Sequence, residues 1–239
     1  MRLAGVRAGD RVLEIGPGIG SLTTALLDTQ AEVTAIELDR HVIPALREVV
    51  GDAVRIVEAD ALTVDLETVI GPGAPGAPWS LVANLPYNVA TPIVMRVLES
   101  APSVRTLLVM VQREVGERLA AGPGTKVYGS PSVKVAYFGR ARVVGLVPPS
   151  VFIPMPRVDS ALVQIVRHDA PPVAVPSPDR LFTLVRAGFG QRRKMLRSAL
   201  RAELGDEVEQ ILEAAGIDPR RRAETLSLDD WAAVARSAS

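Results

Sequence analysis

The sequence predicts an α/β fold with a doubly wound parallel sheet, followed by a small all-helical C-terminal domain. Two observations carry this prediction. Between residues 11 and 111, short runs rich in Val, Ile and Leu alternate with helical segments, the order expected of parallel strands joined by crossover helices. The strand runs are continuously apolar, as expected when helices cover both faces of the sheet.

The elements follow in order along the chain. Strands are expected at residues 11–15, 32–36, 54–57, 80–83 and 106–111. Helices are expected to begin at residues 21 and 40 and to span 91–98 and 113–121, and the Gly/Pro-rich residues 71–78 form a loop. Residues 142–147 and 161–166 are β-segments that flank a proline-rich stretch. We expect them to close the far edge of the sheet as an antiparallel pair.

A proline-rich linker at residues 171–178 divides the chain into two expected domains, 1–170 and 176–239. The second is helical, because Ser177-Pro178 is typical of a helix start with proline at its first position. Gly205 and Gly216 are expected helix ends, and residues 227–230 resemble a capping box.

The composition excludes several classes of protein. The 239 residues include no Cys, which excludes disulfides, Cys-ligated zinc and a thiol nucleophile, and the two His residues make a metal site unexpected. No apolar run approaches the roughly 20 residues of a membrane span, and no signal-peptide pattern is present. We therefore expect a soluble, cytoplasmic protein with no metal and no membrane partner.

A glycine-rich turn after the first strand indicates a cofactor site. Gly16, Gly18 and Gly20 stand between a strand and a helix, where glycines let the backbone approach a ligand near the positive helix end. Glu37 ends the next strand, where a carboxylate binds ribose hydroxyls in Rossmann-like folds. The spacing differs from the G-x-G-x-x-G of nicotinamide sites. S-adenosylmethionine, which lacks a pyrophosphate, suits the spacing found here.

In this interpretation the methionine end of the cofactor meets the glycine turn, its ribose meets Glu37 and its adenine amine meets Asp60. The candidate cofactor-binding residues are Glu14, Gly16, Gly18, Gly20, Glu37, Leu38, Asp60, Ala61 and Asn84. Alternatively, the glycines form only a tight strand–helix turn and Asp60 is a helix cap or loop acid. The coincidence of acids on successive strand ends favours the cofactor.

Asn84-Leu85-Pro86-Tyr87 follows the fourth strand, where an open α/β sheet places its active site. The Asn84 side-chain oxygen and the Leu85 carbonyl would accept the two N–H bonds of an adenine amine and aim its lone pair at a methyl donor. Tyr87 would stack on the base, worth about 1–3 kcal/mol, and the base must be unpaired or extruded. The alternative is an Asn-x-Pro turn that caps the next helix.

Phe152 and Arg157 lie in the proline-rich stretch between the two edge β-segments. Phe152 is either a second stacking wall for the base or a core residue that anchors the loop, and Arg157 would meet phosphate. The candidate catalytic set is thus Asn84, Leu85, Pro86, Tyr87 and Phe152.

Any nucleic-acid surface must be local, because 27 Lys and Arg residues balance 27 Asp and Glu residues. Residues 186–201 carry six cations and no acid. We expect phosphate contacts there because no nearby acid neutralises the run, whereas the alternative is a solvated helix face. The candidate RNA-binding residues are Arg157, Arg192, Arg193, Lys194 and Arg197.

Eight motifs stand in order from about Val12 to the last helix: V-L-E-I-G-P-G-I-G-S-L-T, A-I-E-L-D, E-A-D-A-L, N-L-P-Y-N, V-Q-R-E-V-G-E-R, A-G-P-G-T-K-V-Y-G, P-P-S-V-F-I-P-M-P-R-V-D-S-A and G-F-G-Q-R-R-K-M-L. Together they resemble the ribosomal RNA adenine dimethyltransferase family. The sixth motif and the Q-R-R-K helix resemble the housekeeping small-subunit enzymes more than the antibiotic-resistance enzymes that modify large-subunit rRNA.

The resemblance implies an S-adenosylmethionine-dependent methyltransferase domain (1–170) and a helical domain that contacts RNA (176–239). It implies dimethylation of the N6 amines of two adjacent adenosines in a 3′-terminal hairpin loop of small-subunit (16S) rRNA, with an assembling 30S subunit as substrate. We expect the protein to be a monomer. Two alternatives stay open: a large-subunit rRNA or DNA adenine methyltransferase, and a ribosome-assembly factor with weak or no catalysis.

The sequence departs from this family at its start. Family members carry a segment before the first strand, with a motif like L-G-Q-N-F-L, that lines the cofactor pocket. Here Met1 stands ten residues before the first strand and no such motif is present. The expectation is that this form binds its cofactor weakly or turns over slowly.

Overall fold

The computed structural model describes residues 3–71, 77–153 and 155–238. Contacts divide the chain into two compact units. The first, residues 1–117 and 140–167, holds the sheet, and the second, residues 118–139 and 168–239, is helical. This division differs from the expected boundary at residues 170–176, because residues 118–139 share a hydrophobic core with the C-terminal helices.

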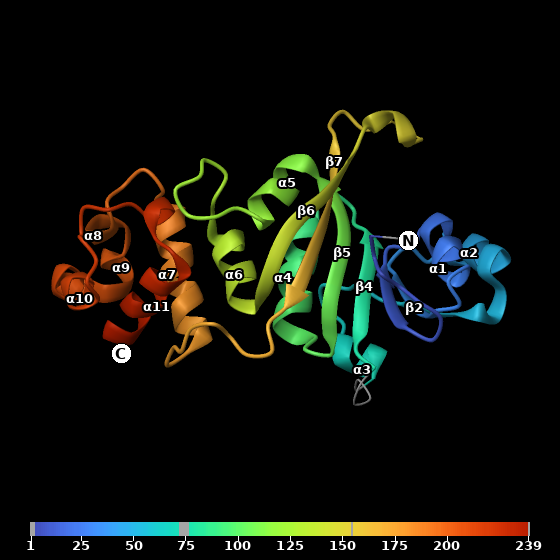
Figure 1. The fold of residues 1–239 in the computed structure, drawn as a ribbon, viewed down its shortest axis with the longest axis horizontal. Helices are drawn as coiled ribbons and strands as arrows, with labels where there is room; N and C mark the ends of the chain where they lie inside the picture. The colour runs from blue at the N-terminus through green and yellow to red at the C-terminus, as the bar shows by residue number, and fades with distance from the viewer. Residues whose placement is uncertain (1–2, 72–76, 154, 239) are drawn as a thin grey trace. The chain divides into compact units, whose positions relative to one another are not determined.

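The sheet has seven strands in the order β3-β2-β1-β4-β5-β7-β6 (Figure 1). Strands β1 to β5 pair in parallel, and β7 pairs antiparallel with β5. The doubly wound sheet with an antiparallel edge pair is therefore confirmed. The strands are β1 (Arg11–Ile15), β2 (Glu32–Glu37), β3 (Val54–Glu58), β4 (Trp79–Asn84), β5 (Val104–Gln112), β6 (Gly139–Val147) and β7 (Ser160–Arg167).

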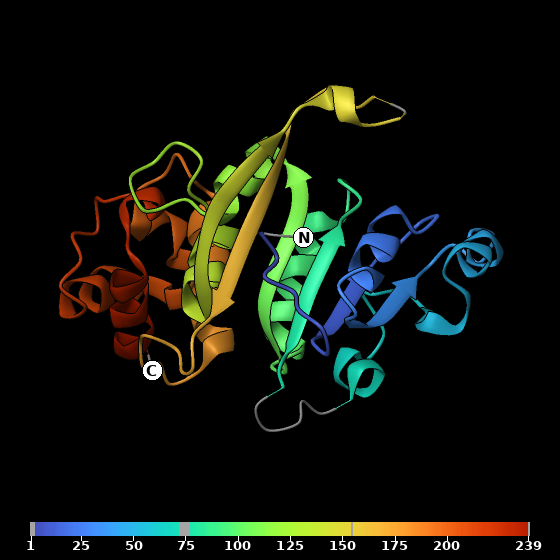
Figure 2. The same ribbon diagram turned by 45° about the vertical axis from the view of Figure 1, so that its right-hand side comes forward.

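Burial explains why β1 and β2 are largely apolar runs. All residues of β1 after Arg11 and of β2 after Glu32 are buried. The helix α4 lies against one face of β4 and β5 (Figure 2) and buries Ile93, Val94 and Val97. The helices of this unit are α1 (Ser21–Leu27), α2 (Ile43–Val50), α3 (Leu66–Ile70), α4 (Ala90–Ser100) and α5 (Arg113–Leu119, which crosses into the second unit). None of the helices in the described part of the chain has the length and apolar character of a membrane span.

The second unit packs around Trp231, which is fully buried. A Cβ on Gly188 would stand only 2.5 Å from Trp231 Cη2, so glycine is what allows α7 to pack closely on α11. The helices of this unit are α6 (Ser130–Phe138), α7 (Pro178–Gly190), α8 (Leu196–Ala199), α9 (Arg201–Leu204), α10 (Val208–Ala214) and α11 (Leu228–Ser237). Short 3₁₀ turns occupy Gly51–Ala53, Pro149–Val151, Gly205–Glu207 and Ala223–Thr225.

Local signals at the helix ends are confirmed. The Ser177 hydroxyl accepts a hydrogen bond from the Arg180 amide at the start of α7. Ser227 and Asp230 form the expected capping box, with bonds of 3.0 and 3.1 Å. Gly205 follows α9 and Gly216 follows α10, both with positive φ.

Two helical expectations are incomplete or wrong. The sequence gives no clear signal for α6, whose S-P-S-V-K-V-A-Y-F is rich in β-branched and aromatic residues of modest helix propensity. Burial of Val133, Val135 and Tyr137 stabilises this helix instead. The basic run is not one helix, because α7 ends at Gly190, residues 191–194 form a turn, and α8 begins at Leu196.

Candidate active site

The strand order brings the predicted site residues to one edge of the sheet. The parallel strands β1 and β4 are neighbours at the point where the strand order reverses, and ligands of open α/β sheets bind at such a point beyond the carboxyl ends. The glycine turn follows β1, and Asn84 is the last residue of β4. These two segments therefore flank the expected ligand position.

The glycine turn is held by backbone and carboxylate contacts. Gly16 and Gly18 have φ of 71° and 56°, the left-handed region that favours glycine. One Glu37 carboxylate oxygen accepts the Gly18 amide at 3.1 Å, and the other accepts the Asp39 amide at 2.9 Å. A Cβ on Gly16 would stand 3.7 Å from Pro86 Cδ, so the glycine turn lies against the turn that follows β4.

A cavity of about 750 Å³ opens beside this turn. Its volume falls within the roughly 300–1,000 Å³ typical of small-molecule and cofactor sites. Apolar side chains of β4 and β5, including Val82, Leu108 and Met110, form much of its wall. Four predicted cofactor-binding residues line it: Glu14, Gly16, Gly18 and Asn84.

The other predicted cofactor-binding residues lie off this wall. Gly20 is the N-cap residue of α1, and a Cβ there would approach Leu46 Cδ1 of α2 to 3.0 Å, so this glycine serves packing. Leu38 is 66% exposed beyond the end of β2, next to Glu37. Asp60 accepts the Leu62 amide at 2.8 Å in a local turn, which agrees with its alternative interpretation as a loop acid. Ala61 is buried beside it.

Glu14 is an unusual carboxyl group. It is 1% exposed, and its Oε2 atom has no hydrogen-bond partner among the described residues. Burial raises the pKa of Glu14 to about 7, and the nearby Glu37 charge acts in the same direction, while a contact to Thr23 opposes them. A carboxylate oxygen without a partner on a cavity wall fits a ligand that presents a positively charged donor, such as an ammonium group.

A second cavity, of about 260 Å³, lies over the turn after β4. Asn84, Leu85, Pro86 and Tyr87 form one part of its wall. Phe152 completes it from the loop between β6 and β7, so the structure brings all five predicted catalytic residues together. Asn84 lines both cavities and is thus shared by the two sites.

Asn84 does not cap the following helix. The N-cap of α4 is Val89, and no side chain bonds to that helix end. The side-chain amide of the exposed Asn84 has no hydrogen-bond partner within the described ranges. The Leu85 amide donates to the Met110 carbonyl at 3.2 Å, which fixes the turn to β5.

Ser160 contacts a residue of the candidate site and was not predicted from the sequence. It is fully buried at the start of β7, and its Oγ lies 2.7 Å from the Tyr87 hydroxyl. Gln112, the last residue of β5, was missed as well. The same strand-end rule that selected Asn84 would have selected Gln112.

The basic run is partly neutralised, so the expectation that no acid lies near it is wrong. Arg192 pairs with Glu224 at 2.6 Å, Arg197 pairs with Glu209 at 3.3 Å, and Arg201 pairs with Asp206. Glu209 and Glu224 stand 12 and 32 residues after their partners, a separation at which local sequence does not reveal the pairing, whereas Asp206 stands only 5 residues after Arg201. The side chains of Arg193 and Lys194 are exposed and have no partner in the described part of the chain, and the same is true of Arg157.

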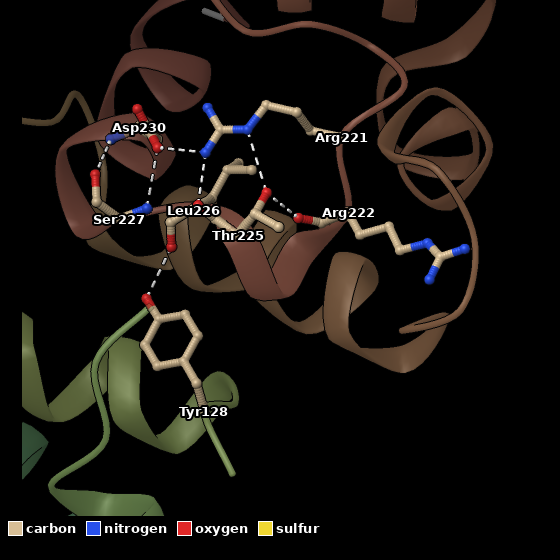
Figure 3. Close-up of polar contacts among 7 residues, drawn as sticks. All are labelled: Tyr128, Arg221, Arg222, Thr225, Leu226, Ser227 and Asp230. Carbon is tan, nitrogen blue, oxygen red and sulfur yellow. Dashed lines mark hydrogen bonds and ion pairs between the residues drawn. The ribbon is translucent and has the colours of Figure 1, made fainter. Parts of the chain in front are cut away.

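Figure 3 shows two neighbouring arginines of the second unit, of which Arg221 is bonded within the protein and Arg222 is not bonded to the residues drawn through its guanidinium. Arg221 donates to Asp230 at 3.1 Å and to the Thr225 carbonyl at 2.6 Å, and Tyr128 donates to the Leu226 carbonyl at 2.9 Å. The guanidinium of the exposed Arg222 points away from this network (Figure 3). Arg222 thus joins Arg193 and Lys194 as a cation available to a ligand.

Comparisons with known proteins identify the family of this chain. A family model described as "Ribosomal RNA adenine dimethylase" matches residues 3–239. The chain is 46% identical over 252 residues to a Bifidobacterium adolescentis protein named ribosomal RNA small subunit methyltransferase A, with 99% of this chain and 82% of the relative covered. A Nocardia farcinica protein of the same name is 47% identical over 247 residues, again with 99% and 82% covered.

Solved structures show the same fold. The 23S rRNA methyltransferase ErmE superposes with a TM-score of 0.69 at 26% identity, covering 99% of this chain and 93% of ErmE. A dimethyladenosine transferase from Plasmodium falciparum gives a TM-score of 0.78 at 24% identity, covering 97% and 90%, which is a likeness of fold. On the family match and the two bacterial relatives, this chain belongs to the ribosomal RNA adenine dimethylase family.

Proposed function

We propose that this protein dimethylates the N6 amines of two adjacent adenosines in a 3′-terminal hairpin loop of small-subunit (16S) rRNA, using S-adenosylmethionine. The observation that carries the proposal is the position of Asn84, which lines both the cavity of about 750 Å³ and the cavity of about 260 Å³ over the turn after β4. We call the smaller of the two the base cavity. A residue shared by two cavities can hold an acceptor amine where it meets a methyl donor. The names of the two bacterial relatives, whose matches cover 99% of this chain, support the small-subunit rRNA as substrate.

The residues of the larger cavity fit S-adenosylmethionine. The unpartnered Oε2 atom of Glu14 would accept a hydrogen bond from the ammonium of the methionine part, and the backbone of Gly16 and Gly18 would approach that part closely. Glu37 keeps lone pairs for ribose hydroxyls after accepting two backbone amides. Leu38 and Asp60 with Ala61 would meet the adenine. When bound, the cofactor supplies an electrophilic methyl group.

The turn after β4 would orient the target amine. The Asn84 side-chain oxygen and the Leu85 carbonyl would each accept one N–H bond of the adenine amine and stabilise the positive charge that develops on its nitrogen. Tyr87 and Phe152 would hold the ring between them and keep water from its faces. Neither oxygen is a strong base. The methylated amine is acidic enough to release its proton to water.

The cations would hold the RNA backbone. Arg157 stands on the loop that carries Phe152, so it is placed to meet a phosphate near the extruded base. Arg193 and Lys194 of the helical unit would meet further phosphates, and the paired Arg192 and Arg197 would support this surface. We further propose that the protein acts as a monomer in the cytoplasm, on an assembling 30S subunit.

Methyl transfer to defined acceptors tests this proposal. Labelled S-adenosylmethionine is supplied with small subunits that lack dimethyladenosine, with large subunits, or with duplex DNA. We expect label in small subunits alone and dimethyladenosine in their rRNA by mass spectrometry. Label in large subunits or DNA would favour the corresponding alternative. An Asn84→Ala variant that still restores normal subunit assembly would make binding, rather than methylation, the essential activity.

A further inference from the structure

A third cavity, of about 440 Å³, lies at the end of β5 beside the base cavity. The loop between β6 and β7 forms a wall of both: it gives Phe152 and Pro156 to the base cavity and Pro149 and Arg157 to this one. We call this third space the Gln112 cavity. Its wall includes three carboxylates, Glu114, Glu117 and Asp159, together with Gln112, Arg113 and Arg157.

Arg113 is paired with two of the three carboxylates of the Gln112 cavity. The Arg113 guanidinium lies 2.7 Å from the Glu117 carboxylate and 3.7 Å from that of Asp159. The Arg113 amide also donates to the Asp159 carbonyl at 2.9 Å. Arg113 is therefore committed to its own neighbours, and its charge is not available to a ligand.

Two polar side chains of the cavity are left over. The side-chain amide of Gln112 and the guanidinium of Arg157 have no hydrogen-bond or ion-pair partner among the residues that the structure describes. They stand with Pro149 and Val158, which give the wall an apolar part. A free cation, a free amide and an apolar surface are the groups that bind a phosphate, a base edge and a base face.

The sheet register places Gln112 close to Tyr87, the residue expected to stack on the target base. Gln112 is directly opposite Ser160 in the antiparallel pair of β5 and β7. Side chains of opposite residues lie on the same face, roughly 4.5–5.5 Å apart at Cβ. Ser160 in turn contacts the Tyr87 hydroxyl at 2.7 Å. A base held by Gln112 would thus be adjacent to one stacked on Tyr87.

We infer that the Gln112 cavity binds the adenosine next to the one being methylated. The Gln112 amide would recognise this adenine through two hydrogen bonds, accepting from its N6 amine and donating to N7. Arg157 would bind the phosphate that joins the two nucleotides. This inference rests on the proposed function and deepens it: while the adenosine being methylated occupies the base cavity, its neighbour on one side, with its N6 amine still unmethylated, occupies the Gln112 cavity.

Neighbour preference of methyl transfer tests the inference. The acceptors are unmethylated small subunits whose rRNA carries A, G, C or U on one side of a target adenosine and then on the other. We expect the wild-type protein to prefer adenine on one side by about 10- to 100-fold in kcat/KM, the discrimination expected of a bidentate contact. Gln112→Ala should abolish this preference. Gln112→Glu should shift it toward cytosine, because a carboxylate accepts from the cytosine amine.

A matched variant controls for general effects on the sheet. Gln164 lies on β7, accepts hydrogen bonds from Arg142 and lines none of these cavities, so Gln164→Ala should keep the wild-type preference. Thermal unfolding of all variants identifies any that fail to fold. If Gln112→Ala fails to fold, the near-isosteric Gln112→Glu replaces it in the test.

The possible outcomes distinguish a failure of the Gln112 inference from a failure of the proposed function. An unchanged preference in a folded Gln112 variant, or an equal loss of activity with every neighbour, would overturn the inference and leave the proposed function intact. Wild-type protein that transfers no methyl group to any small subunit would overturn both.

Discussion

The hydroxyl of Tyr87 lies 2.7 Å from the Oγ of the fully buried Ser160, which ties the turn after β4 to the first residue of β7. The parallel part of the sheet supplies the amide of Asn84, and the antiparallel edge holds the ring expected to stack on the base. The edge pair therefore positions a residue of the site.

We expect Ser160→Ala to lower kcat/KM for methyl transfer by about 2- to 10-fold, because one hydrogen bond worth roughly 0.5–1.5 kcal/mol no longer orients the Tyr87 ring. Tyr87→Phe removes the same bond and keeps the ring, so it should have a similar effect. The double variant should be no worse than either single one. Additive losses would show that the two residues act separately.

Asn84→Ala should lower kcat by about 100- to 1,000-fold, since it removes an oxygen aimed at the developing charge. The side chain is exposed and caps no helix, so the free energy of unfolding should change by less than about 0.5 kcal/mol. Single-turnover kinetics and chemical denaturation measure the two quantities. A large loss of stability would make Asn84 a structural residue.

The Glu14 carboxyl group should make the ligand-free protein less stable as pH rises. Its pKa is about 7 in the folded protein against an ordinary 4.5, so between these values the folded form holds a proton that the unfolded form has released. Stability is therefore lost from pH 4.5 up through pH 7. We expect Glu14→Gln to stabilise the ligand-free protein at pH 8 by on the order of 1–3 kcal/mol and to have little effect at pH 4. Thermal unfolding across pH measures this difference.

Glu14→Gln should have the opposite effect on the cofactor. Loss of the carboxylate removes the partner proposed for the ammonium, so calorimetry at pH 8 should show binding weaker by about 10-fold or more. For the wild-type protein, affinity should fall as pH drops below about 7. A variant that gains stability and keeps full affinity would argue against the ammonium contact.

Arg193 and Lys194 should act differently from Arg192, although the three are consecutive. Replacing Arg193 and Lys194 by Ala should weaken binding to small subunits and reduce the slope of log affinity against log salt by roughly 1.5–2, because two free cations are lost. Arg192→Ala breaks the pair with Glu224 and the bond to the Lys126 carbonyl, so it should chiefly lower thermal stability. Arg220→Ala, which affects an exposed pair with Asp218, is the control. An unchanged salt slope in the double variant would exclude phosphate contact at this turn.

Much of the fold could be predicted because its signals are local. The strands β1 to β5 begin and end within two residues of their expected positions, since continuous apolar runs bounded by glycine or acidic residues specify buried parallel strands. The capping box at Ser227 and the glycine ends at Gly205 and Gly216 are equally local. By contrast, α6 depends on burial of Val133 and Tyr137 against distant helices, and sequence patterning over nine residues does not reveal it.

The sequence by itself determined the α/β sheet, the glycine turn and the Asn84–Tyr87 turn, because each is encoded in a short, contiguous run of residues. Only the tertiary structure decided which side chains are free. It showed that the Oε2 atom of Glu14 is buried without a partner, that Arg192 is held by Glu224, and that Gln112 and Ser160 stand opposite each other beside Tyr87. The physical reason is that ion pairs, strand register and burial join residues far apart in the chain, and their energies depend on distances that only the folded backbone sets.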